Sequence, residues 1–269
     1  MVDLRAYFAR IGYHGSPDAT LANLHAIALA HVQSIPFENL DVLLGRAIDL
    51  APEAVDRKLI AERRGGYCFE QNTLLLRVLQ TMGYSATPLS ARVRYQRPRD
   101  FTPARTHVFV RVALPEGTFF ADVGVGAMSP TAALEFTTDR EQGTPHEPRR
   151  FVFEDGRYFH QVRFGDEWHD VCEFTLEEMP TIDREVGNWF TSAHPQSHFK
   201  NRLLVARAGA EGSRVSILNR ELTFRDRSGT KTTRALESPA DLLGALSEHF
   251  GLEFPKDTEF PCPGLDWTA

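Results

Sequence analysis

Apolar residues recur three and four positions apart in the first third of the chain, which is typical of helices with one buried face. A first helix is expected after the start sequence Ser16-Pro17-Asp18, with His31 away from its apolar face. That face carries Leu21, Leu24, Ala28 and Val32. Ala51-Pro52-Glu53 opens a second helical pattern. Residues 1–83 are therefore predicted to be mainly helical.

A further helical pattern runs from Asn72 to Met82, and Gly83 follows it where a helix commonly ends. Immediately before it stands Arg64-Gly65-Gly66-Tyr67-Cys68. The two glycines allow a tight turn and a close backbone approach. Cys68 is therefore expected in or just before the first turn of this helix.

From residue 84 the pattern changes to short apolar or alternating runs, separated by turn sequences such as Asp155-Gly156. The expected strands are 90–95, 106–112, 118–123, 150–153, 158–162 and 167–169. Repeated short strands with glycine turns favour an antiparallel barrel or sandwich-like sheet. Three more strands, 203–207, 214–218 and 221–224, precede a helix that starts at Ser238-Pro239 and ends at Gly251.

Composition narrows the class of protein. The 269 residues are 42% hydrophobic and 25% charged, which is typical of a globular chain with a sizeable core. No apolar run approaches the roughly 20 residues that span a bilayer, and the first residues lack the pattern of a signal peptide. Three widely spaced cysteines form no disulfide framework and fit a reducing compartment. A cytoplasmic protein without membrane contact is expected.

The net charge of −6 lacks the basic balance of a nucleic-acid binder. One basic segment stands out, because residues 92–105 hold five arginines. Two interpretations are open for this segment, a solvated loop and a site for phosphate groups.

Cys68 is the candidate nucleophile. The free N–H groups and the positive end of a helix dipole favour a thiolate at a helix start. The alternative is an inert buried cysteine, a common fate for this residue type. Metal binding is not expected, because the cysteines lack paired spacing and a proline separates His194 from His198.

A cysteine nucleophile needs a base, and the base needs a group that orients it. His107 lies on one strand of a predicted hairpin, and Asp122 lies at the end of the other. A loop from Leu114 to Gly117 places Phe109 opposite Asp122 and His107 diagonal to it. One register step further opposes His107 and Asp122 directly, whereas a tight Glu116-Gly117 turn separates them by roughly 13 Å. The sequence alone does not decide among these three registers of the hairpin.

The glycine loop, residues 122–130 (Asp-Val-Gly-Val-Gly-Ala-Met-Ser-Pro), follows at once. It lacks the third glycine of the dinucleotide pattern and the Gly-Lys-Ser/Thr of a P-loop. A turn that ends a strand and a backbone nest for an anion both remain open.

Taken together, RGGYCFEQN, the upstream PFENLDVLL, and the downstream THVFVRV and DVGVG resemble the arylamine N-acetyltransferase family over most of the chain to about residue 200. The resemblance implies an α+β fold with a cysteine-protease-like catalytic core. It implies a helical bundle (1–83) that carries the nucleophile and an antiparallel β-barrel (84–190) that carries the histidine and aspartate. An interdomain segment and α/β lid (191–269) would follow. The family triad falls on Cys68, His107 and Asp122.

The resemblance further implies ping-pong transfer of an acetyl group from acetyl-CoA to arylamines or hydrazines, as in xenobiotic metabolism, without a metal. Gly124, Gly126 and Ser129 are then expected along the acyl-CoA channel, and Phe37, Val93 and Phe109 in the substrate pocket. Arg64 and Glu38 are expected to support the site as an ion pair. Ala127 and Met128 depart from the bulkier or hydroxylated residues of the family loop, which leaves acceptor preference open. The expected partners are small molecules, not nucleic acid or membrane, and a monomer or a homodimer is expected.

Three alternatives remain at this point. A papain-like or transglutaminase-like enzyme uses the same residue types in the same order. A binding protein on the same scaffold would keep the pocket without the chemistry. A thiol redox sensor would need a resolving cysteine, and none is close in sequence.

Overall fold

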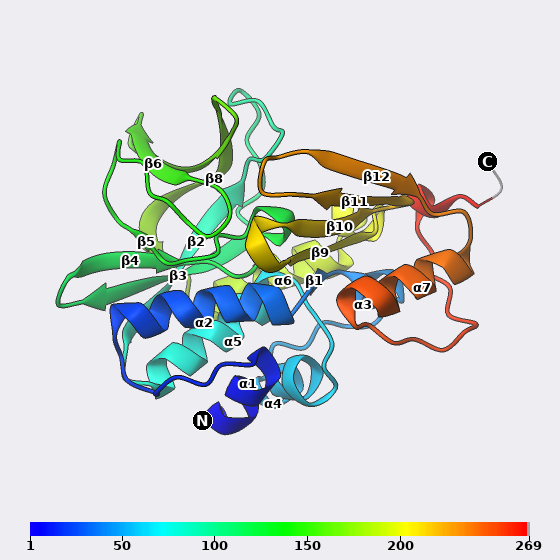
Figure 1. Cartoon of the computed structure of the whole chain (residues 1–269), viewed down its shortest axis with the longest axis horizontal. Helices are drawn as coiled ribbons and strands as arrows, with labels where there is room; N and C mark the ends of the chain where they lie inside the picture. Colours follow the sequence, from blue (N-terminus) through cyan, green and yellow to red (C-terminus); the bar gives the residue numbers. More distant parts are fainter. Residues whose placement is uncertain (268–269) are drawn as a thin grey trace.

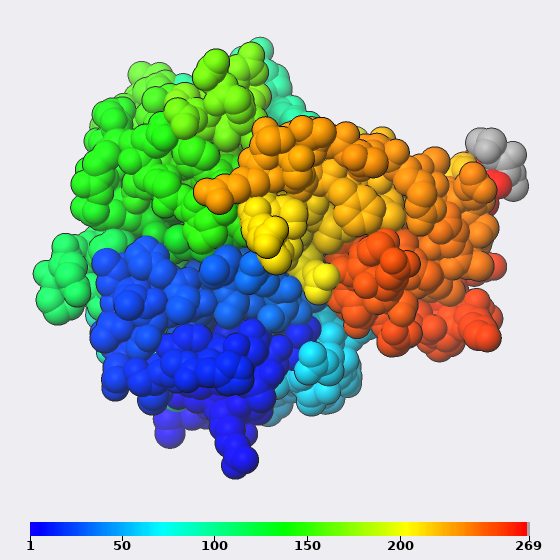
Figure 2. Space-filling view, in the orientation of Figure 1, coloured from blue at the N-terminus to red at the C-terminus, as the bar shows by residue number. Residues whose placement is uncertain are grey.

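The computed structural model describes residues 1–267 as three groups of elements that follow one another along the chain (Figure 1). The N-terminal helices lie beneath a strongly curved sheet, and a second sheet with the last helix lies at the far end of the molecule. Figure 2 shows the three groups in contact on the face drawn. Over these residues, no helix combines the length and the apolar character needed to cross a membrane.

The N-terminal helices bury their apolar faces against the curved sheet, except the short helix Leu40–Leu43, whose leucines pack in the core of the second sheet. They are α1 (Leu4–Ile11), α2 (Leu21–Ser34), α3 (Leu40–Leu43), α4 (Pro52–Asp56), continued by the π-helical turn η1 (Arg57–Ala61), and α5 (Cys68–Thr81). Leu24 of α2 and Leu75 of α5 share one apolar core with Val110 and Val112 of the sheet. The expected helix over residues 72–82 is confirmed, and Cys68 lies in its first turn, as expected.

Two expectations for the first helices are wrong. The helix α2 begins at Leu21 and not at Ser16-Pro17-Asp18, because Asn23 donates to the carbonyls of Ser16 and Asp18 and holds that segment as a loop. His31 is fully buried, although the pattern placed it away from the apolar face. The Tyr7 hydroxyl and the Gln71 amide bond its two ring nitrogens, at 2.8 and 3.2 Å, so burial leaves neither nitrogen unpaired.

The curved sheet is antiparallel, in the order β5–β4–β3–β2–β8–β7–β6. Its strands are β2 (Ser85–Val93), β3 (His107–Leu114), β4 (Gly117–Ala121), β5 (Leu134–Glu135), β6 (Arg149–Glu154), β7 (Arg157–Phe164) and β8 (Glu167–Glu178). A bridge between Thr138 and Phe151 joins the segment after β5 to β6, so the sheet nearly closes into a barrel. Phe109, Phe120 and Phe174 pack in its interior. The expected antiparallel barrel is confirmed.

The hairpin of β3 and β4 turns at Pro115–Glu116, with Leu114 opposite Gly117. Continued beyond β4, this register sets Phe109 opposite Asp122 and His107 diagonal to it, which is the first of the three alternatives. Alternate residues of β3 point to opposite faces. Val110 and Val112 face the helices, so His107 and Phe109 lie on the face toward the barrel interior.

The second sheet, β1–β9–β10–β11–β12, combines segments from both ends of the chain. It consists of β1 (Phe37–Glu38), β9 (Leu204–Ala208), β10 (Arg214–Leu218), β11 (Glu221–Arg225) and β12 (Lys231–Ala235), with α7 (Pro239–Phe250) packed on it. The short strand β1 pairs with β9, Phe37 opposite Ala206. A two-residue strand has no alternation to detect, and β12 is exposed throughout, so neither was expected from the pattern.

The helix α6 (Thr181–Ala193) connects the two sheets. The expected domain boundary at residue 84 falls between α5 and β2, whereas the boundary at 190 falls inside α6. The division into three domains remains a prediction.

Candidate active site

Cys68 is the first residue of α5, and the turn before it is held from both sides. The Glu70 carboxylate accepts a 3.0 Å hydrogen bond from the Tyr67 amide and thereby caps the helix. On the other side, the amide of Glu38 donates to the carbonyl of Gly66 at 3.0 Å. A side chain at Gly65 would lie 2.2 Å from the Pro36 carbonyl oxygen, so only glycine fits there. The glycine pair therefore serves the close backbone approach that fixes the start of α5.

An ionic cluster with buried carboxylates lies beside this turn. Arg64 contacts Glu38 at 2.7 Å, which is the ion pair that the family resemblance implies. Lys58, which the sequence analysis missed, contacts Glu70 at 2.6 Å and Asp41 at 2.7 Å. Burial alone would lower the pKa of Lys58, but the surrounding carboxylates raise it above its ordinary value. The cluster thus joins the helix cap to the segment around β1.

His107 and Asp122 are in direct contact, with His107 Nε2 at 2.7 Å from Asp122 Oδ2. Both are buried, with exposed fractions of 1% and 6%. Burial alone would lower the pKa of His107, but the Asp122 carboxylate raises it to about 10, with a smaller contribution from Cys68. Burial would likewise raise the pKa of Asp122, but His107 and the Asn72 amide hold it below its ordinary value. At neutral pH the pair is therefore an imidazolium and a carboxylate.

The Cys68 side chain lies against this pair. It is 5% exposed, and its sulfur is 3.5 Å from the carbonyl oxygen of Thr106, the residue before His107. Since Asp122 occupies Nε2, the nitrogen left for the sulfur is Nδ1. The three side chains can therefore act as nucleophile, proton carrier and orienting acid.

Asn72 joins the helix that begins with Cys68 to the Asp122 carboxylate, a role that was not expected from the sequence. It lies one turn after Cys68 and donates to Asp122 Oδ1 at 2.9 Å and to the carbonyl of Val108 at 2.6 Å. Its own oxygen accepts from the amide of Val123 at 2.9 Å. The available signal was the spacing of four between Cys68 and Asn72, which places both on one helix face.

The glycine loop passes directly beside Cys68. A Cβ at Gly124 would lie 2.7 Å from Cys68 Cα, and one at Gly126 would lie 3.4 Å from the Phe37 ring. The Ser129 hydroxyl is buried and accepts from the amide of Val125 at 3.0 Å, so it closes the loop on itself. Gly124 and Gly126 thus lie beside the site, and contact of any of these three residues with a ligand remains a prediction.

The expected pocket residues lie at different depths. Phe37 packs in one apolar cluster with Cys68, Tyr67, Met179 and Phe199, the last two of which the sequence analysis missed. Val93 is half-buried at the end of β2. Phe109 is buried in the barrel interior, and its ring stacks on His107 with 6.4 Å between centroids. Contact of Phe37, Val93 or Phe109 with a substrate remains a prediction.

The basic segment 92–105 is mostly neutralised by acids of the barrel. Its ion pairs are Arg92 and Arg94 with Glu173, Arg99 with Glu154 and Asp170, and Arg105 with Glu177. Arg97 lies over the Phe101 ring. These contacts favour a structural role over a phosphate site.

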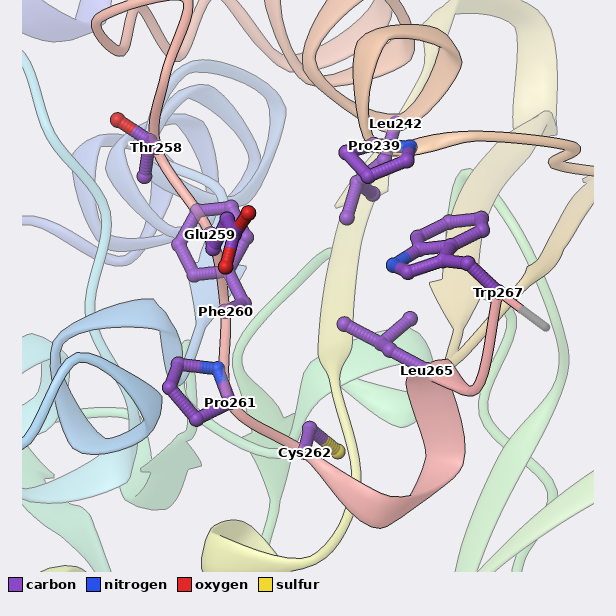
Figure 3. Close-up of a pocket in the computed structure, with 9 residues that line it drawn as sticks. All are labelled: Pro239, Leu242, Thr258, Glu259, Phe260, Pro261, Cys262, Leu265 and Trp267. Carbon is purple, nitrogen blue, oxygen red and sulfur yellow. The ribbon is translucent and has the colours of Figure 1, made fainter.

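A pocket of about 270 Å³ lies elsewhere, between α7 and the C-terminal segment (Figure 3). Leu242 and Pro239 face Phe260, Leu265 and Trp267 across it. It includes neither Cys68 nor His107 and is not part of the candidate site.

Known proteins resemble this chain along nearly its full length. The sequence profile described as "N-acetyltransferase" matches residues 20–258. An arylamine N-acetyltransferase of Mycolicibacterium smegmatis is 40% identical, with 94% of this chain and 92% of that protein covered. An arylamine N-acetyltransferase of Escherichia coli is 37% identical, with 93% and 88% covered. The structure of the Mycobacterium marinum arylamine N-acetyltransferase in complex with CoA superposes with a TM-score of 0.89 at 39% identity, covering 93% of this chain and 92% of that one.

Proposed function

The chain belongs to the arylamine N-acetyltransferase family and is an enzyme of that kind, and we propose that it acts by a ping-pong mechanism through an acetyl thioester on Cys68. The observation that carries the proposal is the 2.7 Å contact between His107 and Asp122 beside a cysteine that begins a helix. The proposed acyl donor is acetyl-CoA, since the Mycobacterium marinum relative binds CoA in the same fold. The proposed acceptors are arylamines and hydrazines.

In the first half-reaction the Cys68 thiolate attacks the thioester carbonyl of acetyl-CoA. The new bond joins sulfur to the acetyl carbon, and the bond from that carbon to the CoA sulfur breaks. The CoA thiolate leaves with the proton of His107. The acetyl group passes from one thioester to another of nearly equal free energy, so this loading step is reversible. The products are acetyl-Cys68, neutral His107 and free CoA.

In the second half-reaction an amine attacks the carbonyl carbon of the acetyl-Cys68 thioester. Arylamines and hydrazines are largely unprotonated at neutral pH, so their lone pair needs no strong base. The nitrogen loses a proton to His107 as the cysteine thiolate leaves. The imidazolium and thiolate of the starting enzyme are thereby restored, and Asp122 stabilises the imidazolium in both halves.

The environment of Cys68 suits a thioester that must outlast CoA release. Cys68 packs in the apolar cluster with Phe37 and Phe199, and the glycine loop lies against its Cα and Cβ. Limited access of water slows hydrolysis of a reactive intermediate. Gly124, Gly126 and Ser129 are proposed to line the path of the acyl donor, and Phe37 to form one wall for the acceptor. A protease-like or transglutaminase-like reaction could use the same triad, but the family match favours transfer from acetyl-CoA.

Intact-protein mass spectrometry tests the proposal. The protein is mixed with acetyl-CoA without an amine, alongside Cys68→Ala and the control Cys262→Ala. One added acetyl group is expected on the wild type and on Cys262→Ala only, and an added arylamine should discharge it. An unmodified wild type whose Cys68 still reacts rapidly with iodoacetamide would overturn acetyl-CoA as donor. Acetylation of Cys68→Ala would overturn the assignment of the nucleophile.

A further inference from the structure

Glu147 accepts hydrogen bonds from three arginines that belong to both sheets. Arg149 of β6 lies 3.0 Å away, Arg214 of β10 binds both carboxylate oxygens at 2.7 Å, and Arg225 of β11 contacts one of them. All four side chains of this Glu147 cluster are buried. The carboxylate therefore joins the barrel to the second sheet.

The Glu147 cluster places several buried charges at the interface between the two sheets, where apolar residues are usual. Arg214 and Arg225 lie directly opposite each other on β10 and β11, where like charges destabilise a sheet. Although burial alone would raise the pKa of Glu147, Arg214 and its neighbours hold it well below its ordinary value. Well-packed apolar residues would often be as stable as such a buried group.

Two of the arginines also hold the glycine loop. Arg149 Nη1 donates to the carbonyl of Met128 at 2.8 Å, and Arg214 Nη2 donates to the carbonyl of Ser129 at 2.8 Å. These carbonyls lie at the end of the short helical turn η2 (Gly126–Met128). The other end of the loop rests on Cys68 through Gly124. The loop is thus fixed at one end by α5 and at the other by the Glu147 cluster.

We propose that Arg214 and Glu147 are positioning residues that set the place of the glycine loop beside Cys68, so that the second sheet controls access of large acyl donors to the thiol. The inference rests on the proposed function. In the proposed function a CoA thioester passes along the loop to reach Cys68, whereas a small ester such as p-nitrophenyl acetate needs only the thiol. Displacement of the loop should therefore slow acetyl transfer to Cys68 from acetyl-CoA far more than from p-nitrophenyl acetate.

Arg214→Gln is the test, and Arg225→Gln is its matched control. Both variants remove one positive charge from the same carboxylate, but within residues 1–267 Arg225 donates to no carbonyl of the glycine loop. The measured quantity is kcat/KM for acetyl-CoA divided by kcat/KM for p-nitrophenyl acetate, at a temperature where melting curves show each variant folded. If Arg214→Gln does not fold, Arg214→Lys and Arg225→Lys carry the same comparison, because lysine keeps the charge but loses the bidentate fork.

A misplacement of the reacting groups by about 1 Å can cost about 100-fold in rate, so the ratio is expected to fall about tenfold or more for Arg214→Gln. The ratio for Arg225→Gln should stay within about twofold of wild type. An unchanged ratio in Arg214→Gln, or an equal fall in both variants, would overturn the proposal and leave the cluster a purely structural one. A wild type that accepts p-nitrophenyl acetate but not acetyl-CoA would instead overturn the proposed function.

Discussion

The side-chain amide of Asn72 donates a 2.9 Å hydrogen bond to Asp122 Oδ1, one helical turn after Cys68. The helix that begins with the proposed nucleophile therefore also fixes the carboxylate that orients His107. Because Asn72 in addition bonds the carbonyl of Val108 and the amide of Val123, the geometry of the triad depends on one neutral side chain.

Asn72→Ala is expected to destabilise the protein and impair catalysis together. It leaves the Val108 carbonyl and the Val123 amide buried without this partner, which should cost about 3 kcal/mol in the free energy of unfolding. Urea unfolding and kcat/KM measure the two effects. Thr73→Ala is the control, since the neighbouring hydroxyl makes no hydrogen bond within residues 1–267. Equal stability of Asn72→Ala and Thr73→Ala would contradict the role assigned to Asn72.

Asp122→Asn should lower the pKa of His107, because burial then acts without the opposing carboxylate. The expected loss in kcat/KM is about 10²- to 10⁴-fold. NMR titration of the imidazole measures the shift, with Asp166→Asn, in an exposed turn, as control. In the wild type the raised pKa of His107 contributes stability that is complete below its ordinary pKa of 6.5 and is lost as pH rises through about 10. A His107 that still titrates near 10 in Asp122→Asn would exclude the carboxylate as the cause.

How much of this site the sequence could predict depends on the range of the interactions. The helix at Cys68 has a clear period, and the hairpin of His107 and Asp122 spans only 16 residues, so local rules limited its register to three cases. Phe37 beside Phe199, and Glu147 beside Arg214, join segments that are far apart in the chain. Neither pairing leaves a periodic trace in the sequence.

Short-range patterns also failed where polar residues are buried. His31 reads as an exposed residue of an amphipathic helix, yet Tyr7 and Gln71 provide partners for both ring nitrogens. A pattern of apolar and polar positions predicts that a polar side chain is exposed, because burial of an unpaired polar group costs free energy. Hydrogen bonds to partners elsewhere in the chain offset that cost, and the pattern contains no information about those partners.

The buried neutral histidines predict a loss of stability in mild acid. Burial lowers the pKa of both His31 and His160 to about 3, whereas the unfolded chain takes up the proton near 6.5. Stability is therefore lost as pH falls below 6.5, by about 2 kcal/mol per histidine at pH 5. Urea unfolding at pH 7 and pH 5 measures the change in the free energy of unfolding between the two pH values. This change should be smaller for His31→Gln than for wild type. His14→Gln, at an exposed position, is the control. If the change between pH 7 and pH 5 were as large in His31→Gln as in wild type, His31 would not be a cause of the loss of stability in acid.

Gly124→Ala is expected to displace the glycine loop. The added methyl would lie 2.7 Å from both Cys68 Cα and Asn72 Nδ2, and overpacking of this kind costs about 1–3 kcal/mol. Both the melting temperature and the rate of acetyl loading should fall. Gly143→Ala is the matched control, because nothing described lies within 4 Å of a Cβ at that position. Normal acetyl loading of Gly124→Ala would show that the loop tolerates movement beside the thiol.

Phe37→Ala separates the acceptor pocket from the chemistry of the thiol. Phe37 packs in the apolar cluster around Cys68 and against Gly126, but it contacts neither member of the His107–Asp122 pair through a hydrogen bond. Its loss should therefore raise KM for arylamines about tenfold, in keeping with about 1–3 kcal/mol for lost apolar contact in a pocket. Alkylation of Cys68 by iodoacetamide should not slow. Phe101→Ala, at an exposed site, is the control. Slower alkylation with an unchanged KM would place Phe37 in support of the nucleophile instead of the acceptor.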